Sequence, residues 1–591
     1  MIQPFEYKRR KTVTVQIGEL AMGSNYPIRL QSMANTDTND IENSVAQGIR
    51  IIEAGADLVR YTTQGIREAE SARLIRAAIR EKGYNTPLVA DIHFNANAAD
   101  LAARNVEKVR INPGNYVGSV KIGDNSDYTN EEFEREYQKI KDRFIPFLTI
   151  CKQHNTAIRI GVNHGSLSER MMNRYGDTPQ GMVASCLEFL EICREQEFNN
   201  VVISMKTSNT VMMVQTVRLL VDEMEKRDLH FPLHLGVTEA GDGEDGRIKS
   251  AVGIGALLLD GIGDTIRVSL SEEPEAEVPV ARLLVDYCTK RESAQALPCI
   301  ESAALNRYEY TKRTTHAVGS IGGNHVPVVI ATMTGNFSTK PDLFVSTDYM
   351  VNAEGDKLPI LPASTLDIAA LNQEPQFIRI QATDLTAKRI EQLKAIKNTV
   401  LLLEAATNNF LTEMRVAQHT LLNSECTTPV IICANYFESE LQSLQIKAAA
   451  DLGVLLIDGF GDGILIENKG NTTIEQTVSV AFGILQATRV RITKTEYISC
   501  PSCGRTMFDL QSVIARIKAR TSHLKGLKIG IMGCIVNGPG EMADADYGYV
   551  GAGRGKISLY KKKECVERNI PENEAVDKLV ELIKTHGDWH D

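Results

Sequence analysis

Several features that would set this chain apart from ordinary cytoplasmic proteins are missing from its sequence. No apolar run in the 591 residues approaches the roughly 20 residues that a membrane-spanning helix needs. The first residues resemble neither a secretory signal nor a Ser/Arg-rich transit peptide. A basic excess is also missing, because the formal net charge is −10, which argues against bulk nucleic-acid binding. We therefore expect a cytoplasmic protein with neither a membrane nor a nucleic acid as its partner.

Cysteine is too sparse for a disulfide scaffold, since only 11 occur in the chain. The hydrophobic share of 43% and the charged share of 24% are those of a globular protein, and the length predicts about three or four domains. Cys565 has no partner at metal-ligand spacing. Seven other cysteines lie in apolar or helical contexts and are expected to be buried reduced thiols: Cys151, Cys186, Cys193, Cys288, Cys299, Cys426 and Cys433.

The remaining three cysteines form a constellation near the C-terminus. Cys500 and Cys503 make a C-x-x-C pair where a predicted strand (495–499) meets a predicted helix (507–524). Cys534 follows a second predicted strand (527–532) and begins a glycine-rich loop that carries Glu541. Thiolates gathered in this way bind zinc or an iron–sulfur cluster.

The number and spacing of the ligands help to decide between zinc and an iron–sulfur cluster. A zinc site usually has two C-x-x-C pairs, or cysteines with a histidine pair. Here the second half supplies one cysteine, and the nearest histidine, His523, falls on the predicted helix. Three thiolates with Glu541 as an exchangeable fourth ligand favour a 4Fe–4S cluster. A structural zinc remains the alternative at this point.

Residues 1–290 alternate short apolar strands with amphipathic helices about eight times, which predicts a (β/α)₈ TIM barrel. A doubly wound open sheet is the alternative, but no G-x-G-x-x-G motif follows the first strand. The predicted strands cover residues 56–61, 87–92, 108–111, 157–161, 200–204, 234–237 and 264–268.

Polar side chains occur at the C-terminal ends of these strands, where the chemistry of such barrels takes place. They are Arg60, Asp91, His93, Arg110, Asn112, Arg159, Asn163, Lys206, Glu239, Arg267 and Ser269. Five of them are fixed cations, which an apolar interior cannot hold unpaired. Because arginine matches phosphate oxygens in pairs, the pattern predicts a phosphorylated ligand. Glu239 is either a counter-ion or a proton donor. His93 is a core histidine, a phosphate donor or an acid.

The middle of the chain, residues 291–490, partly repeats the first domain. The sequence 322–328 is similar to 23–28, and 455–467 aligns with 257–269 without a gap. The second copy is shorter, so a compact or incomplete barrel is expected. It also lacks the cations, since Leu465 and Glu467 replace Arg267 and Ser269. We therefore predict an inserted scaffold that binds no substrate, followed by a small α+β domain over 491–591.

Taken together, these motifs resemble 4-hydroxy-3-methylbut-2-enyl diphosphate synthase, an iron–sulfur enzyme of the non-mevalonate isoprenoid pathway, in its three-domain form. The segments that carry the resemblance are CPSCGR (500–505), GCIVNGPGE (533–541), ADIHF (90–94), VRINPGN (109–115) and GVTEAG (236–241).

The resemblance implies an oxidoreductase that opens the ring of 2-C-methyl-D-erythritol 2,4-cyclodiphosphate to form (E)-4-hydroxy-3-methylbut-2-enyl diphosphate. Two electrons enter, from ferredoxin or flavodoxin, and water leaves. By this resemblance Cys500, Cys503, Cys534 and Glu541 hold the 4Fe–4S cluster, and Glu239, Glu541 and His93 are catalytic. The residues expected to bind substrate are Arg60, His93, Arg110, Asn112, Arg159, Asn163, Lys206, Arg267 and Ser269.

Other interpretations are compatible with the sequence. One is a barrel transferase acting on a pterin or phosphosugar, with a structural zinc, and another is a non-enzymatic iron–sulfur sensor. The oligomeric state is open between monomer and homodimer, and the insertion would allow the active site to close within one chain. Basic residues near the cysteines would suit an acidic electron donor: Arg505, Lys525, Lys528, Arg554, Lys556 and Lys561 to Lys563.

Overall fold

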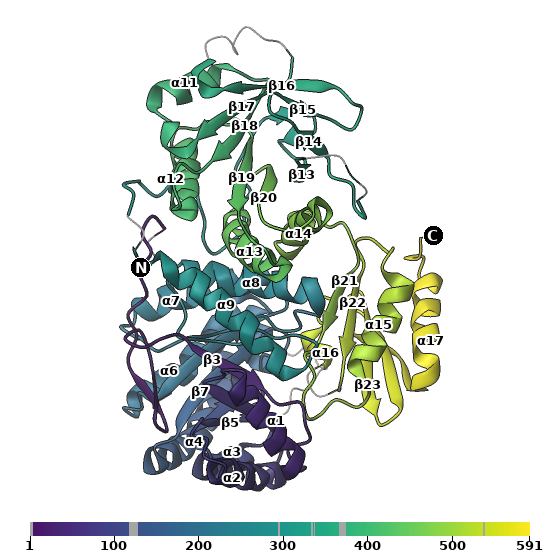
Figure 1. The fold of residues 1–591 in the computed structure, drawn as a ribbon. Helices are drawn as coiled ribbons and strands as arrows, with labels where there is room; N and C mark the ends of the chain where they lie inside the picture. Colours follow the sequence, from purple (N-terminus) through teal and green to yellow (C-terminus); the bar gives the residue numbers. More distant parts are fainter. Residues whose placement is uncertain are drawn as a thin grey trace.

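The computed structural model describes residues 4–117, 128–293, 296–332, 335, 337–365, 374–535 and 538–590. The chain folds into two barrels and a smaller C-terminal domain, which lies beside the first barrel (Figure 1). The predicted fold class is confirmed. The predicted domain boundaries, 1–290, 291–490 and 491–591, stay a prediction. In the described part of the chain, no helix combines the length and apolarity that a membrane crossing needs.

The first barrel is a parallel eight-stranded sheet in the order β8-β7-β6-β5-β4-β3-β10-β9. A bridge between Ile203 and Leu233 joins its two edges. The strands are β3 (Arg29–Met33), β4 (Leu58–Thr63), β5 (Leu88–Ile92), β6 (Lys108–Ile111), β7 (Ala157–Asn163), β8 (Val201–Lys206), β9 (His234–Leu235) and β10 (Thr265–Ile266). The helices are α1 (Ile41–Glu53), α2 (Ile66–Glu81), α3 (Ala96–Asn105), α4 (Asn130–His154), α5 (Glu169–Tyr175), α6 (Pro179–Glu195), α7 (Thr210–Glu225), α8 (Gly243–Leu259) and α9 (Glu277–Thr289).

The second barrel is closed, so of the two expected forms, compact or incomplete, it is the compact one. It closes with fewer residues because β14 and β15 run as an antiparallel meander into β16, where helical crossovers would need more chain. Its strands are β13 (Val328–Ala331), β14 (Leu343–Val345), β15 (Tyr349–Val351), β16 (Lys357–Pro362), β17 (Gln376–Gln381), β18 (Thr399–Glu404), β19 (Val430–Tyr436) and β20 (Gly463–Asn468). Its helices are α11 (Ala387–Ala395), α12 (Phe410–Asn423), α13 (Leu441–Ile457) and α14 (Ile474–Ala487).

The two barrels pack through equivalent helices, α8 and α13, which cross between them in Figure 1. The contact is reciprocal, because Gly255 of α8 meets Ala450, and its counterpart Gly453 meets Val252. A Cβ at either glycine would come within 3.0 Å of the facing helix, so both positions require the smallest residue. The interface therefore resembles that of a two-fold dimer built inside one chain.

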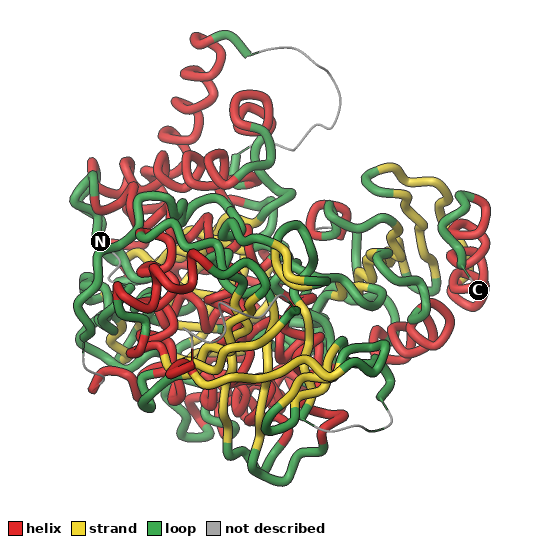
Figure 2. Tube along the Cα trace, turned by 90° about the horizontal axis from the view of Figure 1, so that it is seen from above, coloured by secondary structure: helices red, strands yellow, loops and turns green. Residues whose placement is uncertain are grey.

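The C-terminal domain is a five-stranded sheet in the order β21-β22-β23-β24-β25, with helices packed against it, and forms a separate lobe in Figure 2. Its strands are β21 (Glu496–Ser499), β22 (Lys528–Met532), β23 (Tyr547–Gly553), β24 (Lys556–Lys561) and β25 (Glu564–Pro571). Its helices are α15 (Leu510–Thr521), α16 (Gly538–Glu541) and α17 (Glu572–Thr585). The first two strands are parallel, so the loops that follow them, which carry the cysteines, leave the same edge of the sheet.

Candidate functional site

A cavity lies where the C-terminal domain meets the mouth of the first barrel, with about 750 Å³ of space free of protein atoms. The barrel supplies Met33, Arg60, Asp91, His93, Arg110, Arg159, Asn163, Lys206, Thr238, Glu239, Arg267 and Ser269. The C-terminal domain supplies Cys500, Pro501, Ser502, Cys503, Arg505, Thr506, Met532, Gly533, Cys534, Gly538 and Glu541. Both halves of the site thus come from a single chain.

Direct contacts join the C-terminal domain to the first barrel beside this cavity. The Ser271 hydroxyl donates a hydrogen bond to the Cys500 carbonyl (2.9 Å), and a parallel bridge joins Ala240 to Ser499. Gly165 faces Gly540 across the boundary so closely that a Cβ on Gly165 would lie 2.0 Å from the Gly540 carbonyl oxygen. Gly165 also has a φ of +78°, which favours glycine. The close approach therefore depends on glycine at this position.

Five cations at the strand ends are buried under the C-terminal domain. Burial lowers the pKa of Arg60 to about 10. For Arg159 and Lys206, burial and the neighbouring guanidinium groups lower the pKa well below the ordinary value. The Nε atoms of Arg110 and Arg159 are buried and have no hydrogen-bond partner among the described residues. Such a concentration of positive charge and unused donors suits an anionic guest.

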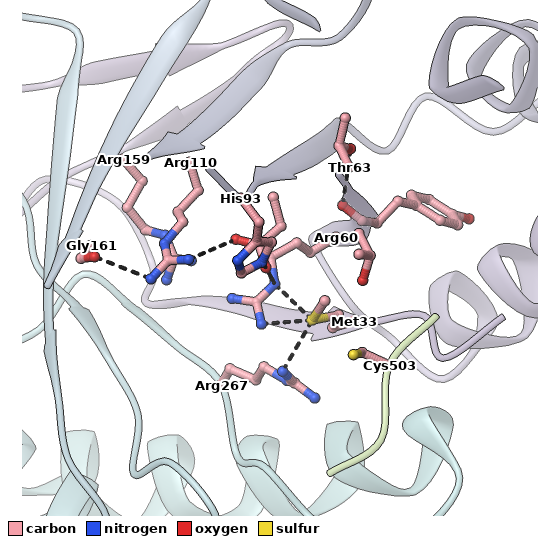
Figure 3. A network of polar contacts seen from close by, with 12 residues as sticks. Met33, Arg60, Thr63, His93, Arg110, Arg159, Gly161, Arg267 and Cys503 are labelled. Carbon is pink, nitrogen blue, oxygen red and sulfur yellow. Dashed lines mark hydrogen bonds and ion pairs between the residues drawn. The ribbon is translucent and has the colours of Figure 1, made fainter. Parts of the chain in front are cut away.

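Asp91 and Met33 hold several of these cations in place. Figure 3 shows the Met33 sulfur between Arg60 and Arg267. The Asp91 carboxylate accepts hydrogen bonds from Arg110 Nη1 (3.2 Å) and His93 Nε2 (3.0 Å). Burial alone would raise the pKa of Asp91, but Arg60 and Arg110 hold it well below the ordinary value. Arg60 donates to the Met33 thioether sulfur through Nε (2.9 Å) and Nη2 (2.6 Å). Asp91 is thus a counter-ion for Arg60 and Arg110. Glu277 is the counter-ion of Arg267 (2.9 Å).

Glu239 and Glu541 bring a carboxyl pair to the centre of the site. Asn163 Nδ2 donates to Glu541 Oε1 (3.2 Å), linking the barrel to the loop after Cys534. Burial raises the pKa of Glu239 well above its ordinary value, and the charge and hydrogen bond of Glu541 raise it further. Glu239 also has a φ of +49°, an uncommon backbone conformation for a glutamate. Glu239 therefore combines a carboxyl pKa raised by burial and by Glu541 with an uncommon backbone conformation.

The three thiols converge from the two loops that follow β21 and β22. The Gly533 amide donates to Cys500 Sγ (3.2 Å), and Arg505 Nε donates to Cys503 Sγ (3.3 Å). Burial raises the pKa of the Cys500 thiol, as does the proximity of the two other cysteines. Three thiols gathered in one cavity wall suit a cation bound among them as thiolates.

Comparison with known proteins agrees with this geometry. The sequence matches the GcpE TIM-barrel domain over residues 12–282 and the GcpE protein C-terminal domain over residues 496–585. It is 57% identical to a 4-hydroxy-3-methylbut-2-en-1-yl diphosphate synthase (flavodoxin) of Parabacteroides distasonis, over 99% of both chains. The proteins of the same name from Phocaeicola vulgatus (55% identity; 99% of both chains) and Porphyromonas gingivalis (52%; 100% of both) are similar along their whole length.

The chain belongs to the 4-hydroxy-3-methylbut-2-en-1-yl diphosphate synthase family. Among solved structures, a dihydropteroate synthase of Stenotrophomonas maltophilia aligns over 48% of this chain and 99% of its own, at 12% identity and a TM-score of 0.34. That likeness is too weak to support a function. The sequence resemblance to the synthase family is therefore confirmed.

Within this synthase-family site, all but one of the residues predicted from the sequence line the cavity. The exception is Asn112, whose amide donates to Ser166 Oγ (3.0 Å) and whose side-chain oxygen accepts from the Gly114 amide (3.1 Å). Arg505, predicted to belong to a basic surface patch, is buried in the cavity wall and is not available at the surface. Met33 and Thr238 also line the cavity but were not predicted. The same strand-end rule could have identified both, because Met33 ends strand β3 and Thr238 directly precedes Glu239.

Proposed function

We propose that this chain carries out the reductive ring opening of 2-C-methyl-D-erythritol 2,4-cyclodiphosphate to (E)-4-hydroxy-3-methylbut-2-enyl diphosphate. In this reaction two electrons enter and one water leaves. The observation that carries the proposal is the shared cavity, in which a cationic barrel mouth faces three thiols and a carboxylate. The names of the full-length relatives agree with it.

The cations of the barrel are proposed to bind the two phosphates of the substrate. Arg110 and Arg159 have unused Nε donors, and arginine forks pair with phosphate oxygens. Lys206 and Arg267 lie in the same wall, and Asn163 and Ser269 add neutral donors. Bound phosphates would relieve the repulsion that now lowers the pKa of Arg159 and Lys206. Substrate binding is therefore expected to stabilise the closed arrangement.

The donor set fits an iron–sulfur cluster held by Cys500, Cys503, Cys534 and Glu541. Within the described residues, no three His, Cys, Asp or Glu side chains lie close enough together to share a single metal ion. Three soft thiolates around a larger space, with one oxygen donor that substrate can replace, suit a 4Fe–4S cluster better than tetrahedral zinc. When bound, this cluster supplies the electrons at an iron with an exchangeable ligand.

Glu239 is proposed to donate a proton in the reaction, and His93 is proposed to orient the substrate through a hydrogen bond. The raised pKa of Glu239 keeps a proton available next to Glu541, as a general acid requires. Burial and the charge of Arg505 lower the pKa of His93 to about 4, so its ring is neutral. Its Nε2–H is taken by Asp91, and Nδ1 has no partner among the described residues. His93 therefore offers an acceptor to a substrate hydroxyl, and Glu239 is the better proton donor.

Flavodoxin is proposed as the electron donor, because the relatives carry it in their names. The test is anaerobic purification or reconstitution, followed by analysis of iron, sulfide and zinc and by incubation with the cyclodiphosphate and reduced flavodoxin. We expect about four iron and four sulfide per chain, as a 4Fe–4S cluster requires, and formation of the linear diphosphate. Zinc without sulfide, or a cluster-loaded protein that leaves the cyclodiphosphate intact, would contradict the proposal.

A further inference from the structure

Arg505 occupies an unusual position for a cation of the C-terminal domain. It lies two residues after Cys503, yet its side chain is only 8% exposed and enters the wall of the shared cavity. The neighbouring Gly504 packs against the barrel so closely that a Cβ there would lie 2.4 Å from the Thr36 carbonyl oxygen. The backbone before Arg505 is therefore held against the barrel, and closure of the two domains is what buries the guanidinium.

The guanidinium group faces two different sets of charges. Its Nε donates to Cys503 Sγ (3.3 Å), and Nη1 is buried without a hydrogen-bond partner among the described residues. Burial alone would lower its pKa, but Cys503, Cys534 and Asp91 raise it above the ordinary value. The positive charge of Arg505 in turn helps to keep His93 neutral, which places it next to the barrel's polar centre.

We infer that Arg505 is a shared positioning residue, which binds the cysteine thiolate with one edge and a phosphate oxygen of the substrate with the other. This rests on the proposed function, because it assumes both a cluster and an anionic substrate. A fixed cation beside a ligand thiolate stabilises the more negative, reduced state and so raises the reduction potential. A buried unused N–H beside the cationic pocket is a ready donor to a phosphate oxygen. One side chain thus links substrate binding to electron uptake.

The test compares three variants of the cluster-loaded protein. Arg505→Gln removes the charge. Arg505→Lys keeps the charge but lacks the guanidinium group that could donate to two partners at once. Arg568→Gln, the matched control, removes an exposed arginine of the same domain. The reduction potential is measured by mediated redox titration without substrate. The dissociation constant of the cyclodiphosphate is measured by calorimetry on the oxidised protein without reductant, so that no turnover occurs.

Arg505→Gln is expected to lower the reduction potential and to weaken cyclodiphosphate binding at least about tenfold, as loss of a charged hydrogen bond does. Arg505→Lys is expected to keep the potential near that of the wild type but to weaken binding, and Arg568→Gln to change neither. Wild-type values for both quantities in Arg505→Gln would overturn the inference. If Arg505→Gln does not retain a cluster, unchanged binding by Arg505→Lys would overturn it instead. A wild-type protein without a cluster or without cyclodiphosphate binding would contradict the proposed function itself.

Discussion

At the scale of single residues, the site depends on charges that are kept in unfavourable surroundings. Six cationic side chains line one cavity, against the carboxyl groups of Asp91, Glu239 and Glu541. Burial and the charge of Glu541 raise the pKa of Glu239, so the site disfavours a negative charge at this carboxyl. Such an arrangement weakens the fold locally, and an anionic substrate would compensate for it.

Glu239→Gln tests the proton-donor role. The amide keeps the size and the neutral state of the protonated glutamate but cannot give up a proton in the reaction. We expect kcat to fall roughly 10²–10⁴-fold, the usual contribution of a general acid, with little change in KM. Steady-state kinetics with the cyclodiphosphate would measure both. Glu273→Gln, at an exposed position of the same barrel, is the control, and a wild-type kcat for Glu239→Gln would exclude the role.

Much of this site could be predicted at the residue scale, because the ends of parallel strands share one face of a barrel. That rule was sufficient to place Arg60, Arg159 and Lys206 together. It could not show that Arg505 is buried, since its burial depends on how two domains meet. Nor could it show that the Asn112 side chain bonds to Ser166 and to the Gly114 amide and does not line the cavity.

At the scale of elements, the closed site depends on the contact between the loop after β7 and helix α16. The Gly165 position tests this contact, since a Cβ there would overlap the Gly540 carbonyl. Gly165→Ala is expected to displace the C-terminal domain and to lower kcat by roughly 100-fold, as a misplacement of about 1 Å can do. Iron content should stay unchanged.

Gly176→Ala is the matched control for this substitution. Gly176 also has a positive φ (+67°), but its nearest neighbour, Thr178 Cγ2, would lie 3.6 Å from a Cβ. The alanine there adds backbone strain without a clash, so it should cost stability and leave kcat alone. Equal losses of kcat in the two variants would show that strain, and not closure, is responsible.

A buried ion pair also attaches the C-terminal domain to the first barrel. Lys249 Nζ of α8 lies 2.9 Å from Glu496 Oε1 of β21. Burial would raise the pKa of Glu496, but Lys249 and Arg489 lower it to about 2. The stabilisation, roughly 3 kcal/mol for this shift, is complete above pH 4.5, the ordinary pKa, and is lost as the pH falls towards about 2.

Lys249→Met is therefore expected to destabilise the C-terminal domain near neutral pH, because it leaves a buried carboxylate without its main partner. The single tryptophan, Trp589, packs against His523 in that domain and reports its unfolding in urea. The unfolding midpoint should fall for Lys249→Met but not for Lys82→Met, an exposed control in the first barrel. An unchanged midpoint would mean that the ion pair does not hold the domain.

The sequence pattern predicted some strands of the fold and not others. Seven strands of the first barrel lie close to their predicted positions, because parallel strands buried on both faces are mostly apolar runs. Strand β3 (Arg29–Met33) was not among the predicted strands. Strand β25 was missed, since most of its side chains are exposed, including Val566 at 47%, and its sequence shows no apolar alternation. The meander β14–β16 was not predicted either, and two of its strands, β14 and β15, have only three residues each.

At the scale of the whole molecule, the inserted barrel differs from the first in its interior. Leu465, the counterpart of Arg267, is buried in an apolar cluster with Phe377, Leu402 and Ile431. Apolar side chains thus occupy positions where the first barrel carries cations. That this domain binds no substrate and acts as a scaffold stays a prediction, which its packing on the first barrel through α8 and α13 would suit.

The arrangement of domains leads to a prediction about sharing of sites between chains. Because the contacts from Asn163 to Glu541 and from Ser271 to Cys500 form within one chain, each chain should hold a complete site. A mixture of Cys534→Ala and Arg110→Ala proteins is therefore expected to stay inactive in the conversion assay. Recovered activity would show that one chain closes over the barrel of another.

The most direct measurement of the central claim is a single turnover with the reduced protein. Cluster-loaded protein is reduced, freed of excess reductant and mixed with the cyclodiphosphate, and the linear diphosphate is counted against intact clusters. Because a reduced 4Fe–4S cluster stores one electron and the reaction takes two, we predict at most about one linear diphosphate per two reduced clusters. We also predict a parallel loss of the reduced cluster signal, and no product from Cys534→Ala. Reduced clusters that persist beside unchanged cyclodiphosphate would contradict the proposed reaction.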